Sequence, residues 1–244
     1  RIYDPARFDP QVSASAGLPR PSRRSFLSTI DALLADAADN LGAQIVFDGN
    51  VGDNLFCFLH SAAPVVDRLR VEGPGRGAVE TLLDMCRVTG CDLPTMVKAT
   101  LKRLVRRPRG EWPCDRRLLA DHLGLDEALD PVTNWLDIDV GRHGGKHDHL
   151  ALIMRAQHHV HGLGVGPERF SPLMSQPLLE LCLSIPTWLW AKGGRNRALA
   201  RDAFAADLPP SLLARTSKSG PDSFIRLAFH HHRSALRELL LDGL

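Results

Sequence analysis

The stretch that most constrains the fold is a short apolar run followed by a turn rich in glycine and polar residues. Residues 43–47 read AQIVF, and residues 48–57 read DGNVGDNLFC. An apolar run with β-branched residues predicts a buried strand of a parallel sheet. The apolar spacing of residues 26–41 predicts a helix that Gly42 ends, and we expect a second helix to begin near Asp53.

This order of helix, strand, loop and helix is typical of a doubly wound α/β fold. We expect one domain with three portions. Residues 1–24, which contain four prolines, would be irregular, and residues 71–244 would be mainly helical. Residues 25–70 would form an α/β portion of the kind that commonly binds a nucleotide. Apolar residues at helical spacing predict the helices of the last portion. They are 77–88, 93–105, 114–123, 147–160, 177–185, 195–206 and 225–241.

Composition narrows the class of protein. The formal net charge is +2, so no global field favours nucleic acid or an anionic membrane as a partner, and we interpret the basic run 102–109 as a solvated helix end. The five cysteines form no CxxC pair, and Cys57 and Cys182 lie in apolar runs, as buried thiols do. With no membrane-spanning stretch and no signal peptide, these features predict a cytoplasmic protein.

The polar turn after the strand is the first candidate site. Ligands of open parallel sheets bind beyond the carboxyl ends of the strands. Glycines such as Gly49 and Gly52 would let backbone approach a phosphate, and the Asp53 carboxylate could hold Mg²⁺. The alternative is structural: the glycines serve only a tight turn, and Asp53 serves only as a helix N-cap.

Two later stretches carry a family resemblance. Residues 166–186 read GPERFSPLMSQPLLELCLSIP, and 193–221 read GGRNRALARDAFAADLPPSLLARTSKSGP. With DGNVGDNLF before them, they resemble the synthetase domain of the asparagine synthase family over roughly residues 25–225. Glu168 four residues before Pro172, the helix ending in LSIP and the Arg-x-x-Lys-x-Gly turn carry the likeness. The resemblance implies a Rossmann-like adenine-nucleotide-hydrolase core, here incomplete, with a largely helical C-terminal portion.

Departures from the family pattern point to a branch. Asn54 replaces the usual Glu, and Phe170 and Ser175 stand where asparagine synthetases usually have Arg and Asp. GDNLFC and SQPLLELCLSIP look more like the enzymes that close the macrolactam ring of lasso peptides. The family's upstream SGGxDS loop has no counterpart here, so we interpret the chain as truncated at its N-terminus.

The resemblance implies ATP-dependent amide formation through an acyl-adenylate, with Mg²⁺. Asp53 would be a Mg²⁺ carboxylate, and Glu168 would assist deprotonation of the attacking amine. Lys218 would stabilise charge in the transition state and contact pyrophosphate. Arg215 would assist on the phosphate side, and Gly220 closes the same turn. Taken alone, Glu168 and Lys218 read as ordinary surface residues.

Three functions follow from this interpretation. The first is macrolactam closure of a lasso-type peptide, which joins a side-chain carboxylate to the amino terminus. The alternatives are a glutamine-hydrolysing asparagine synthetase and a non-catalytic relic or interaction module. The substrates would be ATP and a peptide or amino-acid carboxylate. The apolar face of residues 234–244 would dock a neighbouring domain, or a leader-peptide-processing protein in the lasso case.

Histidines and tryptophans offer two further patterns. Gly144 and Gly145 argue against a helix that would align His143 with His147, and cysteines at ligand spacing are missing, so the histidines do not favour a metal site. They would instead line the substrate cleft. We expect Trp188 and Trp190 to pack at a helix end rather than to stack on a ligand. The remaining clustered histidines are His149, His158, His159, His161, His230, His231 and His232.

Overall fold

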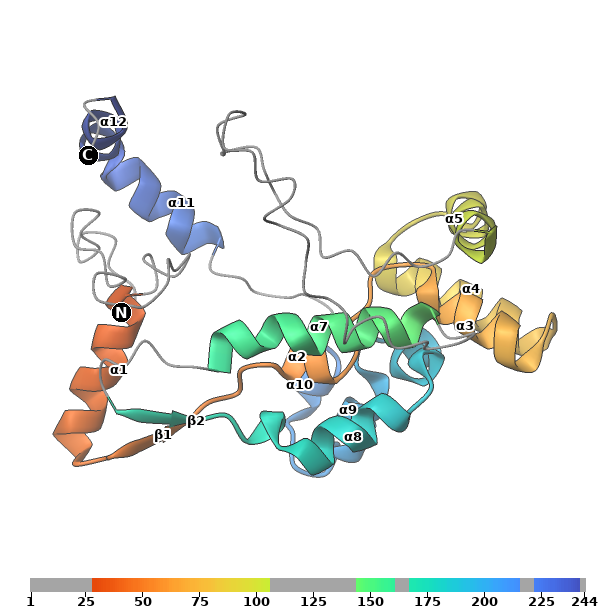
Figure 1. Cartoon of the computed structure of the whole chain (residues 1–244), viewed down its shortest axis with the longest axis horizontal. Coiled ribbons are helices and arrows are strands. Elements are labelled where there is room, and N and C mark those ends of the chain that lie inside the picture. The colour runs from red at the N-terminus through yellow and green to blue at the C-terminus, as the bar shows by residue number, and fades with distance from the viewer. Residues whose placement is uncertain (1–27, 106–143, 161–166, 216–221, 242–244) are drawn as a thin grey trace, which may run out of the picture. The chain divides into compact units, whose positions relative to one another are not determined.

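The computed structural model describes residues 28–105, 144–160, 167–215 and 222–241 (Figure 1). The chain divides into two compact units whose segments alternate along the sequence. Unit 1 comprises residues 1–49, 159–172 and 217–244, and unit 2 comprises 50–158 and 173–216. The chain therefore passes from one unit to the other four times.

Unit 1 contains helix α1 (Ser28–Leu41), strands β1 (Ile45–Phe47) and β2 (Glu168–Phe170), and helices α11 (Asp222–His231) and α12 (Arg233–Leu241). Helix α1 and its stop confirm the sequence prediction. Gly42 takes a φ of 62°, and the N–H of Ala43 donates to the Ala38 carbonyl at 2.8 Å. A left-handed glycine followed by this hydrogen bond is a common helix C-terminus, because it satisfies a carbonyl that the helix leaves unpaired.

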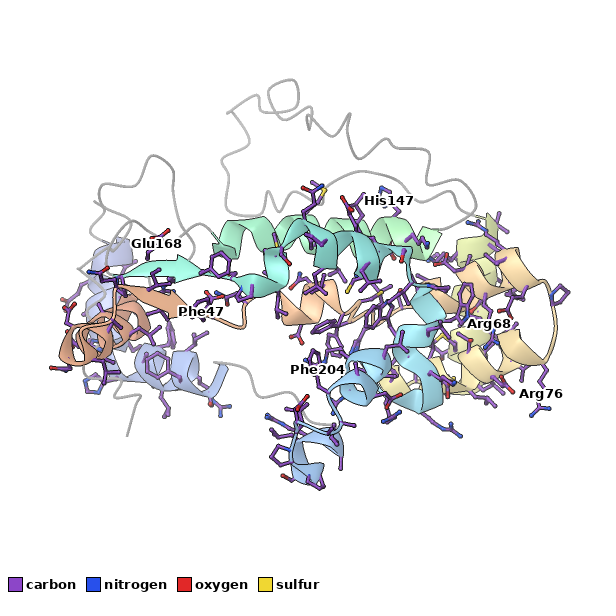
Figure 2. All side chains as sticks on the ribbon, turned by 90° about the horizontal axis from the view of Figure 1, so that it is seen from below. Phe47, Arg68, Arg76, His147, Glu168 and Phe204 are labelled. Atoms are coloured by element: carbon purple, nitrogen blue, oxygen red, sulfur yellow. The ribbon has the colours of Figure 1, made fainter. Side chains whose placement is uncertain are left out.

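The sheet differs from the expectation. β1 and β2 pair in parallel, with Ile45 opposite Glu168 and Phe47 opposite Phe170. The predicted strand is present and parallel, but it is not buried: Ile45 and Phe47 are 50% and 70% exposed. The Phe47 and Phe170 rings meet edge to face at 5.6 Å, and Figure 2 shows Phe47 and Glu168 on this sheet. A strand buried on both faces needs neighbours that these two strands do not supply.

Two further elements of unit 1 were not anticipated. β2 is too short, at three residues, to show a period in the sequence. The stretch 225–241, predicted as one helix, is divided into α11 and α12 at His232. In α11, Phe224 and Ala228 are buried at a spacing of four, whereas Leu227 and Phe229 are exposed. The apolar pattern of this stretch therefore overstates how much of it is covered.

Within the described residues, the helices of unit 2 follow one another along the chain as α2 (Gly52–Leu55), α3 (Ala63–Glu72), α4 (Arg76–Thr89), α5 (Leu93–Val105), α7 (Gly144–Val160), η4 (Pro172–Met174), α8 (Gln176–Ser184), η5 (Thr187–Gly194), α9 (Ala198–Ala203) and α10 (Pro210–Leu213). The first residue of η4 and the last two residues of α7 belong to unit 1. Helices α4, α5, α7, α8 and α9 match predicted ones, whereas α3 was missed. The predicted helix 114–123 lies outside the described residues.

The core of unit 2 lies among α3, α4, α5 and η5. Val65, Met85, Met96 and Ala191 are each at most 6% exposed and pack into one cluster. Trp188 and Trp190, in η5, are buried as well, which confirms that they pack rather than present a ligand-stacking face. The described part of the chain is mostly helical with a small parallel sheet, which is compatible with an α/β fold. The Rossmann-like core stays a prediction.

Helix α7 begins where the sequence argued against a helix. Gly144 and Gly145 form its first turn. The buried Asp67 carboxylate accepts hydrogen bonds from the Gly145 N–H at 2.8 Å and from the Thr187 hydroxyl at 2.6 Å. A carboxylate at a helix N-terminus satisfies a free N–H and interacts favourably with the helix dipole. This long-range cap offsets the poor helix propensity of glycine.

The buried positions of two cysteines match the sequence prediction. Cys57 and Cys182 are 4% and 2% exposed, as predicted, and burial raises the pKa of both thiols. The described cysteines are all free thiols. Among the helices that the structure describes, none is long and apolar enough to cross a membrane.

Candidate active site

The turn that leads into α2 has an unusual backbone. Val51, Cys57 and Arg197 are the non-glycine residues with positive φ in the described ranges, at 76°, 52° and 54°. Such angles are rare for residues other than glycine and genuinely outlying for a β-branched one. Strain of this kind persists where surrounding structure enforces it, which is often at functional sites. Val51 and Cys57 flank α2, and Arg197 contacts it, so all three lie around one place.

The glycines of the turn do not supply its left-handed backbone position. Neither Gly49 nor Gly52 takes a positive φ, and the left-handed position belongs to Val51. A Cβ on Gly49 would meet nothing within 4 Å, whereas one on Gly52 would lie 3.3 Å from Leu173 Cδ1. Gly52 therefore permits close packing against the segment that precedes α8. Gly49 belongs to unit 1, and its proposed approach to a phosphate stays a prediction.

Asp53 forms an ion pair that sequence analysis missed. Its Oδ1 accepts a hydrogen bond from Nη1 of Arg197, a residue 144 positions further along the chain. The two side chains are 30% and 28% exposed, so the pair is partly shielded from water. Asp53 lies inside the first turn of α2, and Val51 occupies the N-cap position, so the purely capping interpretation of Asp53 is wrong.

Arg197 is held from several sides. Its guanidinium carbon lies 5.4 Å from the centroid of the Phe58 ring, within the range of a cation–π interaction. Its Nε donates to Oδ1 of Asn196 at 3.3 Å. Arg197 also occupies the N-cap position of α9. These contacts aim one guanidinium at the Asp53 carboxylate.

Arg197 belongs to an arginine cluster, which comprises Arg195, Arg197, Arg201 and Arg215. Arg201 lies at its centre: burial and then repulsion from the other three lower the pKa of its guanidinium. Arg201 Nη1 donates to the carbonyls of Leu212 and Leu213 at 3.0 and 2.9 Å, and Nη2 donates to the Arg215 carbonyl at 2.9 Å. Arg201 thus ties residues 212–215 to α9, the helix in which it lies.

Two carboxylates pair with members of this cluster. Arg195 pairs with Asp202 at 2.9 Å, and Arg197 pairs with Asp53. Arginine forks suit phosphate oxygens, so the arrangement favours an anionic ligand such as a polyphosphate.

Two hydrogen bonds fix α2 against α7. Nδ2 of Asn54 donates to the Leu152 carbonyl at 2.7 Å, and Nε2 of His149 bonds the Leu55 carbonyl at 2.7 Å. His149 is fully buried, and its ring meets that of Trp190 edge to face at 6.3 Å. Burial lowers the pKa of the His149 imidazole, which favours the neutral ring. His149 is therefore a structural residue beneath the turn rather than part of a substrate cleft.

The remaining predicted site residues lie elsewhere. Glu168 is exposed in β2 of unit 1, where its N–H donates to the Gln44 carbonyl at 3.1 Å. Arg215, a member of the arginine cluster, is exposed. Lys218, Gly220 and His143 lie outside the described residues. The structure brings together Gly52, Asp53 and Arg197, and the roles of Glu168 and Lys218 stay predictions.

The residues present can be tested against the implied Mg²⁺. The described residues contain no group of three or more His, Cys, Asp or Glu side chains that could hold a metal. Asp53 supplies one carboxylate, and Mg²⁺ in nucleotide sites is commonly bound by one or two carboxylates together with the phosphates. The site therefore fits Mg²⁺ that arrives with a polyphosphate better than the bare ion.

These features define a mainly helical domain with a small parallel sheet and a cationic site at a strained turn. Residues 163–244 match the family model described as asparagine synthase, so this part of the chain resembles the synthetase domain of that family. The match indicates a ligase that forms amides with ATP. It covers Glu168, Arg197, Arg215 and Lys218 but not Asp53. No curated protein and no solved structure matches the chain significantly.

Proposed function

We propose that the protein joins a carboxylate to an amine with ATP, through an acyl-adenylate. In the first step a carboxylate oxygen of the substrate attacks the α-phosphorus of ATP, and pyrophosphate leaves. In the second step the amine attacks the acyl carbon, AMP leaves, and the amine loses its proton. Bound Mg²⁺ would neutralise polyphosphate charge in the first step. The single observation that carries the proposal is the Asp53–Arg197 pair at the edge of the arginine cluster.

The chain's residues have distinct parts in this proposal. Asp53 would hold Mg²⁺, and Arg215 and Lys218 would stabilise the charge of the leaving pyrophosphate. Glu168 would accept the proton of the attacking ammonium group. The family match over residues 163–244 supports the last three assignments. The guanidinium beside Asp53 supports the first, because it suits the polyphosphate with which Mg²⁺ would arrive.

The specific reaction that we propose is macrolactam closure of a lasso-type peptide. Phe170 and Ser175 support it, because they stand where asparagine synthetases carry Arg and Asp. Phe170 presents an exposed aromatic ring beside Phe47, a surface suited to a peptide rather than to free aspartate. The alternative, a glutamine-hydrolysing asparagine synthetase, would instead show ammonia-dependent amidation of aspartate.

ATP–pyrophosphate exchange tests the proposal in the natural protein that contains this chain. Candidate substrates are precursor peptides with an acidic side chain, and free aspartate. Exchange should be lost in Asp53→Ala and Lys218→Ala and retained in Arg76→Ala. Arg76 is a suitable control because its side chain is 93% exposed and pairs with Glu80 in its own helix. Exchange that persists in both site variants would refute the proposed chemistry, and exchange with aspartate alone would refute the peptide substrate.

A further inference from the structure

We infer that Arg197 competes with Mg²⁺ for the Asp53 carboxylate, so that metal binding at this site depends on an accompanying polyphosphate. The inference rests on the proposed function and adds to it a condition for metal binding. Arg197 would release Asp53 and bind a phosphate oxygen when a Mg²⁺–polyphosphate complex enters. Without the anion, the guanidinium would keep the carboxylate engaged.

The first argument is geometric. Oδ1 of Asp53 is already the acceptor for Nη1 of Arg197, and a carboxylate oxygen that faces a guanidinium is a poor ligand for a cation. Phe58 and Asn196 hold the guanidinium in this place. The backbone of Arg197 is left-handed, with a φ of 54°, and so is that of Val51 at the start of α2. The structure thus accepts unfavourable backbone angles at both ends of the pair.

The second argument concerns charge. The pKa of the Arg201 guanidinium is lowered first by burial and then by the charges of Arg197, Arg195 and Arg215, so the four guanidiniums lie within electrostatic range of one another. A bare divalent cation at Asp53 would lie beside Arg197, a member of this cluster, and like charges at short range repel strongly in a partly shielded site. A polyphosphate brings the negative charge that removes the repulsion. It also offers Arg197 a new acceptor, since guanidinium forks bind phosphate as well as carboxylate.

Removing Arg197 should therefore shift two affinities in opposite directions. Arg197→Ala removes the guanidinium that both occupies the Asp53 carboxylate and repels a cation. Mg²⁺ alone should therefore bind this variant about tenfold more tightly. Pyrophosphate in the presence of Mg²⁺ should bind about tenfold more weakly, because a phosphate ligand is lost. Arg197→Lys, which keeps a charge without the fork, should lie between the wild type and Arg197→Ala for both ligands.

Isothermal titration calorimetry on the natural protein measures both affinities, with Mg²⁺ alone and then with inorganic pyrophosphate at saturating Mg²⁺. Arg76→Ala should match the wild type in both titrations. The double variant Asp53→Asn/Arg197→Ala should lose the gain in Mg²⁺ affinity, which would assign the gain to Asp53. Circular dichroism confirms that each variant is folded, and Arg197→Lys keeps the test open where Arg197→Ala does not fold.

The outcomes separate this inference from the proposed function. An Mg²⁺ affinity that is unchanged or weaker in both Arg197 variants, with pyrophosphate exchange still present in the wild type, would overturn the competition and leave the proposed chemistry standing. A wild-type protein that neither binds pyrophosphate nor exchanges it would overturn both. Opposite shifts in the two affinities support the competition.

Discussion

The carboxylate of Asp67 caps helix α7 by accepting a hydrogen bond from the N–H of Gly145, 78 positions away in the sequence. The other carboxylate oxygen accepts a hydrogen bond from the hydroxyl group of Thr187 in η5. One buried acid thus joins α3, α7 and η5. Because an unpaired buried donor is unfavourable, each of these elements depends on the other two for its local geometry.

The first prediction concerns the close approach at this cap. Replacing a helical glycine with alanine normally stabilises a helix by about 1 kcal/mol. At Gly145 the new Cβ would lie 3.0 Å from Asp67 Cγ and 3.1 Å from Thr187 Oγ1. We expect Gly145→Ala to lower the free energy of unfolding by about 2 kcal/mol, since the side chains around it are buried and cannot give way. Urea denaturation measures this change. Gly49→Ala, with open space around it, is the control, and an equal effect of both would contradict the packing argument.

The pH dependence of stability should report His149. Burial holds its pKa below the ordinary value of 6.5, and the nearby Lys146 charge lowers it further, against the hydrogen bonds to the Leu55 and Asn54 backbone. As pH falls through 6.5, the unfolded chain binds a proton at this residue while the folded protein does not. The free energy of unfolding should therefore decrease below pH 6.5, until the folded ring also titrates.

His149→Gln isolates this contribution, since glutamine can still donate to the Leu55 carbonyl but does not titrate. Thermal unfolding should be measured between pH 5 and 8, the range in which histidine changes charge. Stability should change less steeply with pH in this variant than in the wild type. His230→Gln, at an exposed position of α11, should keep the wild-type slope. Identical slopes in all three proteins would show that His149 does not control the pH dependence.

The residue after Asp53 also offers a test. The side-chain N–H of Asn54 donates to the Leu152 carbonyl at 2.7 Å. Asn54→Asp keeps the shape but places a carboxylate oxygen against that carbonyl oxygen. We expect a loss of about 2 kcal/mol in the free energy of unfolding at neutral pH, because the hydrogen bond becomes a repulsive contact. Acidic pH should recover part of this loss through protonation of the new carboxyl, and a variant as stable as the wild type would contradict the assignment.

A fourth prediction tests the role of Arg201. Lysine cannot reproduce a fork that reaches the carbonyls of Leu212, Leu213 and Arg215. In Arg201→Lys we expect residues 212–215 to open more often, with limited proteolysis there faster by about tenfold. Arg226→Lys, at an exposed position of α11, should leave the cleavage rate unchanged. Unaltered proteolysis of both variants would mean that the fork does not hold this segment.

The sequence was most informative where periodicity spans several turns. Helices α1, α4 and α5 were predicted nearly to the residue, because their apolar positions recur over 13 or 14 residues. Helix α7 was misjudged at its start, since the cap that offsets Gly144 and Gly145 comes from Asp67, far away in the chain. The burial of β1 was wrong for a related reason: an apolar run predicts a strand but not how many neighbours cover it.

The sequence indicated both partners of the candidate site but not that they pair. The spacing of DGNVGDNLF singled out Asp53, and the likeness to a known family singled out the stretch that contains Arg197. Nothing local linked the two, because the ion pair spans 144 positions. The left-handed angles of Val51 and Arg197 were equally hidden, since neither residue type favours them. The one signal for Arg197 was its place in the GGRNR stretch. Its importance became apparent from its pairing with Asp53.

The alternation of the two units along the chain has a consequence for biosynthesis. Unit 2 takes its last segment from residues 173–216, and unit 1 takes its last segment from residues 217–244. A ribosome must therefore deliver the chain to about residue 216 before either unit has all of these segments. Folding during translation cannot finish one unit and then begin the next, as it does for domains strung one after another. A nascent chain stopped before residue 216 would hold an incomplete version of both units, and it would need shielding by a chaperone for longer than a chain of the same length with sequential domains.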